Sequence, residues 1–166
     1  MNDDKLPNTL NVSLQTHENY CGASVAQAIL RSTTRYSAPQ DKLAEKLGIH
    51  RLGELNKERL REVLDEFEVP HSEFAEAAPT NGVVNIRPGS LDTLTESLNN
   101  GNIVVVNYVL VDKGHMAIAA ELSHGRIILN DPILGNMYPM QLADFLDHWV
   151  SGNTRWKRWF MSIPYT

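Results

Sequence analysis

The sequence contains a single cysteine, Cys21, among its 166 residues. One thiol can form no disulfide within the chain, and no cysteine-based zinc cluster can assemble in one chain. The first residues are polar and lack the apolar run of a secretory signal, and apolar runs such as Ile103–Val106 are far too short to span a bilayer. These absences favour a soluble protein in a reducing compartment, and we expect a cytoplasmic location.

The chain also has little net charge, with a formal value of −5 at pH 7. A mildly acidic protein is a poor partner for a nucleic-acid backbone or an anionic membrane, so we expect neither as the main partner. The histidines other than those discussed below have no acidic or cysteine neighbours at metal-ligand spacing, so we predict no metal and no cofactor. The oligomeric state is not indicated.

The composition, 42% hydrophobic and 21% charged, is that of an ordinary globular protein. A chain of this length fits one domain, residues 1–166, and buries roughly two-thirds of its unfolded surface without help from metals or disulfides. Residues 1–12 have the character of an extended N-terminal arm.

The first half of the chain has helical patterns. Small and apolar residues over Tyr20–Arg31 predict a helix buried on several sides. Ser37 has a capping-box relation to Gln40 and so predicts the start of a second helix, and Ser90 predicts the cap of a later one. Between them, apolar residues at helical spacing predict a third helix that ends before Pro70.

The second half has β patterns. Ile103–Val111, Met116–Leu122 and Arg126–Leu129 are rich in β-branched and apolar residues, and a turn-like segment separates the last two, which predicts a hairpin. A short helix, Leu142–Trp149, and a final strand, Trp156–Ile163, follow. The predicted class is α+β, with a helical N-terminal half packed on a mostly antiparallel sheet.

Cys21 stands at the start of the first predicted helix. The free N–H groups and partial positive charge at a helix N-terminus favour thiolate over thiol, and the thiolate is the reactive form of cysteine. This position is therefore suited to a nucleophile, although a lone cysteine is more commonly a small core residue.

A base for this nucleophile is found in Gly114-His115, at the mouth of an apolar strand. The pair Asn130-Asp131 ends the next strand, and in an antiparallel hairpin the start of one strand lies beside the end of the other. We therefore expect His115 to lie beside Asn130 or Asp131, either of which could orient its ring. Gln15 lies six residues before Cys21, where its amide and the Cys21 N–H could form an oxyanion hole.

These residues resemble a known family. Gln15 with Tyr20-Cys21-Gly22-Ala23-Ser24, then Gly114-His115, then Asn130-Asp131-Pro132, are similar to papain-like cysteine peptidases, most closely to the C39-like branch. That branch contains the leader-cleaving domains of bacteriocin exporters, and phytochelatin synthase is a relative. The resemblance implies a papain-like fold, Cys21 as nucleophile, His115 as base and acid, Asp131 as orienting residue and Gln15 in the oxyanion hole.

The function expected from this set is a cysteine peptidase or amidase that acts on a peptide or amide substrate through a thioester. An acyltransferase or transpeptidase of the phytochelatin synthase-like kind would use the same residues. A non-catalytic binding module that kept the fold is the alternative from another class. A role as a host-directed effector protease would differ in biology and not in chemistry.

Overall fold

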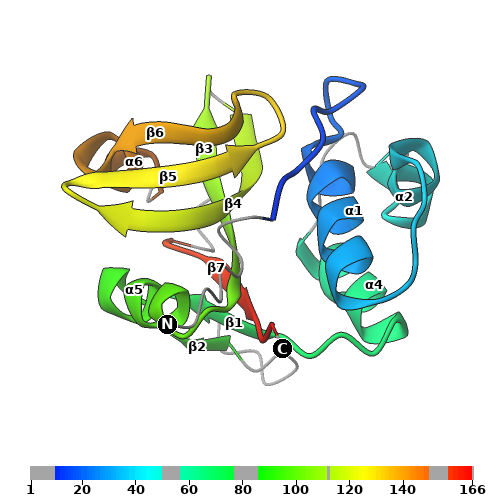
Figure 1. The fold of residues 1–166 in the computed structure, drawn as a ribbon, viewed down its shortest axis with the longest axis horizontal. Helices are drawn as coiled ribbons and strands as arrows, with labels where there is room; N and C mark the ends of the chain where they lie inside the picture. The colour runs from blue at the N-terminus through cyan, green and yellow to red at the C-terminus, as the bar shows by residue number, and fades with distance from the viewer. Residues whose placement is uncertain (1–9, 50–56, 77–85, 112, 150–156, 166) are drawn as a thin grey trace, which may run out of the picture.

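A computed structural model describes residues 10–49, 57–76, 86–111, 113–149 and 157–165 (Figure 1). The described helices are α1 (Cys21–Thr33), α2 (Gln40–Lys46), α4 (Lys57–Glu66), α5 (Leu91–Asn99) and α6 (Leu142–Trp149). The strands are β1 (Ser72–Ala75), β2 (Ile86–Pro88), β3 (Ile103–Leu110), β4 (Lys113–Ser123), β5 (Arg126–Asp131), β6 (Gly135–Gln141) and β7 (Phe160–Ile163).

The strands form one seven-stranded sheet in the order β2-β1-β7-β3-β4-β5-β6. Every neighbouring pair is antiparallel except β1 and β2, which are parallel. Helices α1, α2 and α4 gather on one side of the molecule, and the sheet with α5 and α6 occupies the other (Figure 1). The expected α+β class, with a helical N-terminal half on a mostly antiparallel sheet, is confirmed.

The centre of the sheet is buried on both faces, and β3 shows how its sequence allows this. Ile103 and Val105 pack into the core that α1, α2 and α4 share, while Val104, Val106 and Tyr108 pack into a second core with α5 and α6. Successive strand residues point to opposite faces, so a continuous β-branched run is the pattern that a doubly covered strand requires.

The helix starts agree with the sequence at two places and disagree at a third. Helix α1 begins at Cys21, one residue after the predicted start, and Ser90 caps α5 by accepting the Thr93 N–H in a capping box. The prediction that Ser37 opens the second helix is wrong, because Pro39 occupies the N-cap position of α2. Proline is tolerated at this position because the N–H that it lacks would have no acceptor within the helix.

The strand predictions were incomplete. β6 was not predicted because Gly135 and Pro139 interrupt its pattern and most of its residues are exposed. β1 and β2 were also missed, since each has no more than four residues. The last strand begins at Phe160 and not at Trp156, which lies outside the described residues.

The expected N-terminal arm falls partly outside the described residues, which begin at Leu10. From there the chain runs between the sheet and α1 before it turns into the helix (Figure 1). The backbone of Val12 exchanges two hydrogen bonds of 2.9 Å with the side chain of Asn136 on β6, and the hydroxyl of Ser24 on α1 donates to the carbonyl of Ser13. The segment therefore joins the helical side of the molecule to the sheet.

None of the described helices is both long enough and apolar enough to cross a membrane.

Candidate active site

Cys21 is the first residue of α1 and is only 8% exposed. Its backbone N–H belongs to the first turn of the helix, whose N–H groups have no acceptor within the helix. The remaining residues of this turn, Gly22, Ala23 and Ser24, are small and buried, which lets the helix N-terminus lie close to the sheet. The thiol is therefore placed in a partly positive and largely enclosed position.

His115 lies near the start of β4 and is 4% exposed. Its ring nitrogen Nε2 lies 2.8 Å from Oδ1 of Asp131, the last residue of β5, which is fully buried. The strands reach this arrangement through an irregularity in their register between Ala119 and Glu121. The structure thus brings His115 and Asp131 together, as the hairpin argument expected.

Four donors among the described residues surround the Asp131 carboxylate. Oδ1 lies within hydrogen-bond distance of His115 and also accepts the backbone N–H groups of Ile133 and Leu134, at 2.8 and 2.9 Å. Oδ2 accepts the hydroxyl of Tyr108 at 2.5 Å. A buried charge is tolerated when donors satisfy it in this way, so Asp131 can remain a carboxylate.

Asn130, the alternative partner of His115, has other contacts. Its amide nitrogen donates to the carbonyl of Leu10 at 2.7 Å, and its oxygen accepts the N–H of Met137 at 2.8 Å. Adjacent residues of a strand face opposite ways, so Asp131 faces the histidine while Asn130 binds the N-terminal segment.

The environment changes the proton affinities of the histidine and the aspartate. Burial lowers the pKa of His115, but hydrogen bonds with Asp131 and Cys21, together with the attraction of both, outweigh it and raise this pKa to about 9. Burial raises the pKa of Asp131, yet the bond with His115 and those from Tyr108 and the Leu134 N–H bring it below its ordinary value. Since Nε2 is engaged by Asp131, Nδ1 is the ring nitrogen left for the Cys21 thiol.

Gln15 occupies the loop before α1, and its contacts differ from the expected ones. Its amide Nε2 donates to the carbonyls of His17 and Glu18 at 2.9 and 2.7 Å, so both amide hydrogens are in use within the loop. Its Oε1 is buried and has no hydrogen-bond partner among the described residues. The Gln15 backbone N–H donates to the carbonyl of Pro132 at 2.9 Å, which ties the loop to the turn after Asp131.

A further contact joins the two segments that carry the cysteine and the histidine. Glu18 precedes Cys21 by three residues, Lys113 precedes His115 by two, and their side chains form an exposed ion pair of 2.9 Å. Exposed pairs of this kind contribute little to stability, but this one marks where the two segments meet.

Tyr108 is the residue of this site that the sequence analysis missed. It lies on β3 directly opposite His115, and the two rings meet edge to face with centroids 5.5 Å apart. The signal that would reveal it is the register of β3 and β4, in which Leu110 pairs with Lys113 and position 108 therefore pairs with position 115. The strand patterns over Ile103–Val111 and Met116–Leu122 do not indicate this register, so they do not pair Tyr108 with His115.

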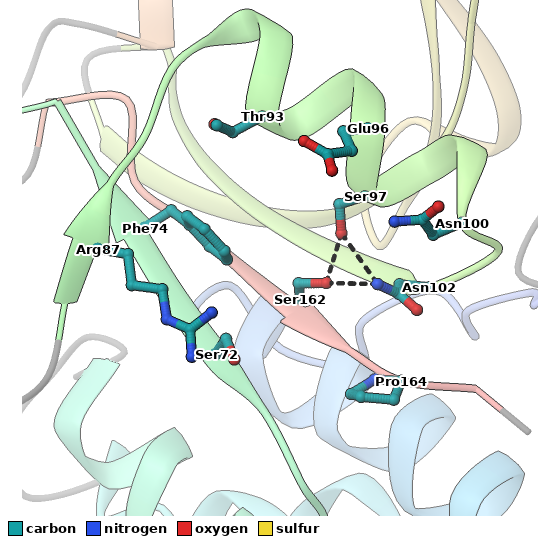
Figure 2. A pocket seen from close by; sticks show the side chains of 10 residues that line it. All are labelled: Ser72, Phe74, Arg87, Thr93, Glu96, Ser97, Asn100, Asn102, Ser162 and Pro164. Carbon is teal, nitrogen blue, oxygen red and sulfur yellow. Dashed lines mark hydrogen bonds between the residues drawn. The ribbon is translucent and has the colours of Figure 1, made fainter.

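A separate polar pocket of about 330 Å³ lies between α5 and the strands β1, β2 and β7, and contains none of the predicted site residues (Figure 2). Ser97, Ser162 and Asn102 form a hydrogen-bonded group on one wall, and the Arg87 side chain lies on the opposite side, near Phe74. Across the part of the chain that the structure covers, no group of three or more His, Cys, Asp or Glu side chains is placed to hold a metal ion.

Neither a model of a known protein family nor a curated protein matches the sequence. Solved structures do match the fold. The peptidase domain of Streptococcus ComA, a bi-functional ABC transporter involved in quorum sensing, superimposes with a TM-score of 0.69 at 11% identity, over 95% of this chain and 99% of that one.

Two further structures are similar. A double glycine motif protease from an AMS/PCAT transporter, solved in complex with the leader peptide, gives a TM-score of 0.66 at 11% identity, over 95% of this chain and 93% of that one. A protein proposed to be a C39-like peptidase from Bacillus anthracis gives 0.68 at 10% identity, over 96% of each chain. The chain thus has the fold of C39 peptidase domains, and the predicted resemblance is confirmed at the level of the fold.

Proposed function

We propose that this protein is a cysteine peptidase or amidase with Cys21 as nucleophile, His115 as base and acid, and Asp131 as the residue that orients the histidine. The observation that carries the proposal is the buried contact of His115 with Asp131, together with the hydrogen bond and the attraction by which Cys21 raises the pKa of the same ring. The C39 peptidase fold, in which these residues come together, supports the same chemistry.

In the proposed reaction the imidazolium of His115 faces the thiolate of Cys21, and Asp131 stabilises the positive ring. The thiolate attacks the carbonyl carbon of the scissile bond, and the resulting oxyanion collapses as the carbon–nitrogen bond breaks. His115 donates its proton to the leaving amine, which leaves a thioester on Cys21. His115 then takes a proton from water, the hydroxide attacks the thioester, and the acid leaves.

The oxyanion requires donors, and the first-turn N–H of Cys21 is one candidate. Gln15 is the other, in line with the sequence expectation. Its two amide hydrogens bond to the carbonyls of His17 and Glu18. The side chain must therefore break one of these hydrogen bonds to donate to a substrate carbonyl. The nitrogen and oxygen of this amide cannot be exchanged, because the oxygen would then face the two carbonyl oxygens of His17 and Glu18.

The proposed substrate is a peptide. One of the similar proteases was solved in complex with the leader peptide, which favours a peptide over other amides. The shared fold at 11% identity does not carry the leader sequence over to this chain.

Cleavage of a complex mixture of denatured peptides tests the proposal. We expect new amino termini with the wild-type protein and with a His124→Ala control, whose substitution lies in the exposed β4–β5 turn, and none with Cys21→Ala. Reaction in ¹⁸O water should place the label in the new carboxyl groups, whereas transfer to an amine would leave them unlabelled. Equal termini counts for folded wild type and Cys21→Ala would refute a peptidase.

A further inference from the structure

The hydroxyl of Tyr108 has a defined place in the site. The residue is 2% exposed, and its O–H donates to Oδ2 of Asp131 at 2.5 Å. Its ring packs against Phe145 on α6, with centroids 6.0 Å apart, and edge to face against His115. A phenylalanine would make the same ring contacts, so packing alone does not account for the buried hydroxyl.

We propose that Tyr108 is a positioning residue of the site, holding the second oxygen of Asp131 so that the first is presented to His115, a role that rests on the proposed function. Oδ1 already serves His115 and two backbone N–H groups, whereas Tyr108 is the donor that the described residues offer to Oδ2. A fully buried carboxylate oxygen without a donor is costly, and a strong donor fixes the carboxylate plane.

The charges around the phenol keep it a donor. Asp131 on β5 accepts its hydrogen bond and His115 lies beside it on β4, while Tyr138 on β6 and Cys21 on α1 add to the electrostatic potential at the phenol. Burial first, and then the carboxylate of Asp131, raise the pKa of Tyr108 far above its ordinary value. Tyr108 therefore remains protonated through the pH range in which a cysteine enzyme works.

The hydroxyl of Tyr108 also reduces the negative charge that the Asp131 carboxylate presents to His115. A hydroxyl on Oδ2 withdraws electron density from the carboxylate, so its removal leaves a more negative group beside the imidazolium. In Tyr108→Phe the pKa of His115 should therefore rise, while Asp131 orients the imidazole ring of His115 less firmly. A purely structural tyrosine would affect folding and leave the titration of His115 unchanged.

The test follows the His115 titration by NMR in wild type and Tyr108→Phe, with Tyr36→Phe as the matched control. Tyr36 packs against Phe67 in the other core, so its hydroxyl is remote from Asp131. We expect the His115 midpoint to move to higher pH in Tyr108→Phe only. This readout needs no turnover, so it stands even where the wild-type protein cleaves nothing and the proposed function fails.

Steady-state kinetics provide a second test of the role of Tyr108. With an active wild-type protein, Tyr108→Phe should lower kcat about tenfold, a typical loss for one hydrogen bond to a charged group, and leave KM unchanged. In an Asp131→Asn background the same substitution should have little further effect, because both changes act through one group. An unchanged His115 midpoint and an unchanged kcat in folded Tyr108→Phe would overturn the proposal.

A second variant tests the proposal if Tyr108→Phe does not fold. Replacement of Tyr108 by 3-fluorotyrosine keeps the ring and the hydroxyl but makes the hydroxyl a stronger donor. The His115 midpoint should then move to lower pH, opposite to the phenylalanine variant. A midpoint that stays at the wild-type value would again reject the role.

Discussion

Asp131 and its neighbour Asn130 have different partners at the end of β5, and this difference determines which of them can orient the His115 ring. The structure separates them, because the strand alternation sends Asp131 to the histidine and Asn130 to the carbonyl of Leu10. Which of the two residues faces His115 depends on a register irregularity between β4 and β5, and no local sequence pattern indicates that irregularity.

Gln15 gives a residue-scale prediction. Gln15→Ala should lower turnover by roughly 10²–10³, the usual loss for one oxyanion donor, and leave thiol alkylation almost unchanged, because alkylation develops no oxyanion. Both rates are to be measured on the same protein. Gln27→Ala is the matched control, since it also removes a side-chain bond to a backbone carbonyl, that of Ala38.

The result also separates two roles for this glutamine. In the structure its amide holds the carbonyls of His17 and Glu18, so it could order the loop instead of serving the oxyanion. Loss of alkylation in parallel with turnover would assign Gln15 to the loop and withdraw its oxyanion role.

At the scale of elements, the long periodic segments were predictable and the short ones were not. α1, α5 and the strands β3 to β5 follow from small residues, a serine cap and β-branched runs in the sequence. β6 is held by pairing with β5 and by the contact of Asn136 with the N-terminal segment. Tertiary contacts of this kind override a pattern that contains proline and glycine.

The two serines predicted as helix caps provide a matched pair for stability. Ser90→Ala removes the side-chain oxygen that accepts the Thr93 N–H and should lower the free energy of unfolding by about 1 kcal/mol. Ser37→Ala should change it by less than about 0.5 kcal/mol, because Ser37 is exposed and lies before the N-cap of α2. Urea denaturation measures both, and equal effects would contradict the cap assignments.

On the scale of the whole molecule, the site lies where the helical side meets the sheet. Cys21 comes from α1 on one side, and His115 and Asp131 come from strands on the other. The segment from Leu10 to Gln15 joins the two sides through Asn130, Asn136 and Pro132. Sequence patterns predicted each part and an extended arm, but not the contacts by which this segment connects the two sides, because those contacts are made to residues far along the chain.

The raised pKa of His115 makes the stability of the fold depend on pH. The folded value of about 9 exceeds the ordinary value of 6.5, so the protonated ring stabilises the folded state. This contribution is fully present below about pH 6.5 and is lost as the pH rises through about 9. It is on the order of 3 kcal/mol, because each tenfold change in proton affinity corresponds to about 1.4 kcal/mol.

Unfolding free energies from pH 6 to 10 for wild type, His115→Gln and His124→Ala measure this effect. The advantage of wild type over His115→Gln should shrink steadily between pH 6.5 and 9, while His124→Ala should follow wild type. A gap between wild type and His115→Gln that widens with pH would show that the histidine is held neutral in the fold.

The pH dependence of Cys21 alkylation by iodoacetamide is the sharpest test of the proposed catalytic pair, since the single cysteine makes the readout specific. We expect fast labelling of wild type well into the acid range, because the thiolate is paired with the His115 imidazolium. In His115→Ala the acid-range labelling should disappear, because the imidazolium that pairs with the thiolate is gone. A wild-type profile that is the same as that of His115→Ala would contradict a catalytic pair of Cys21 and His115.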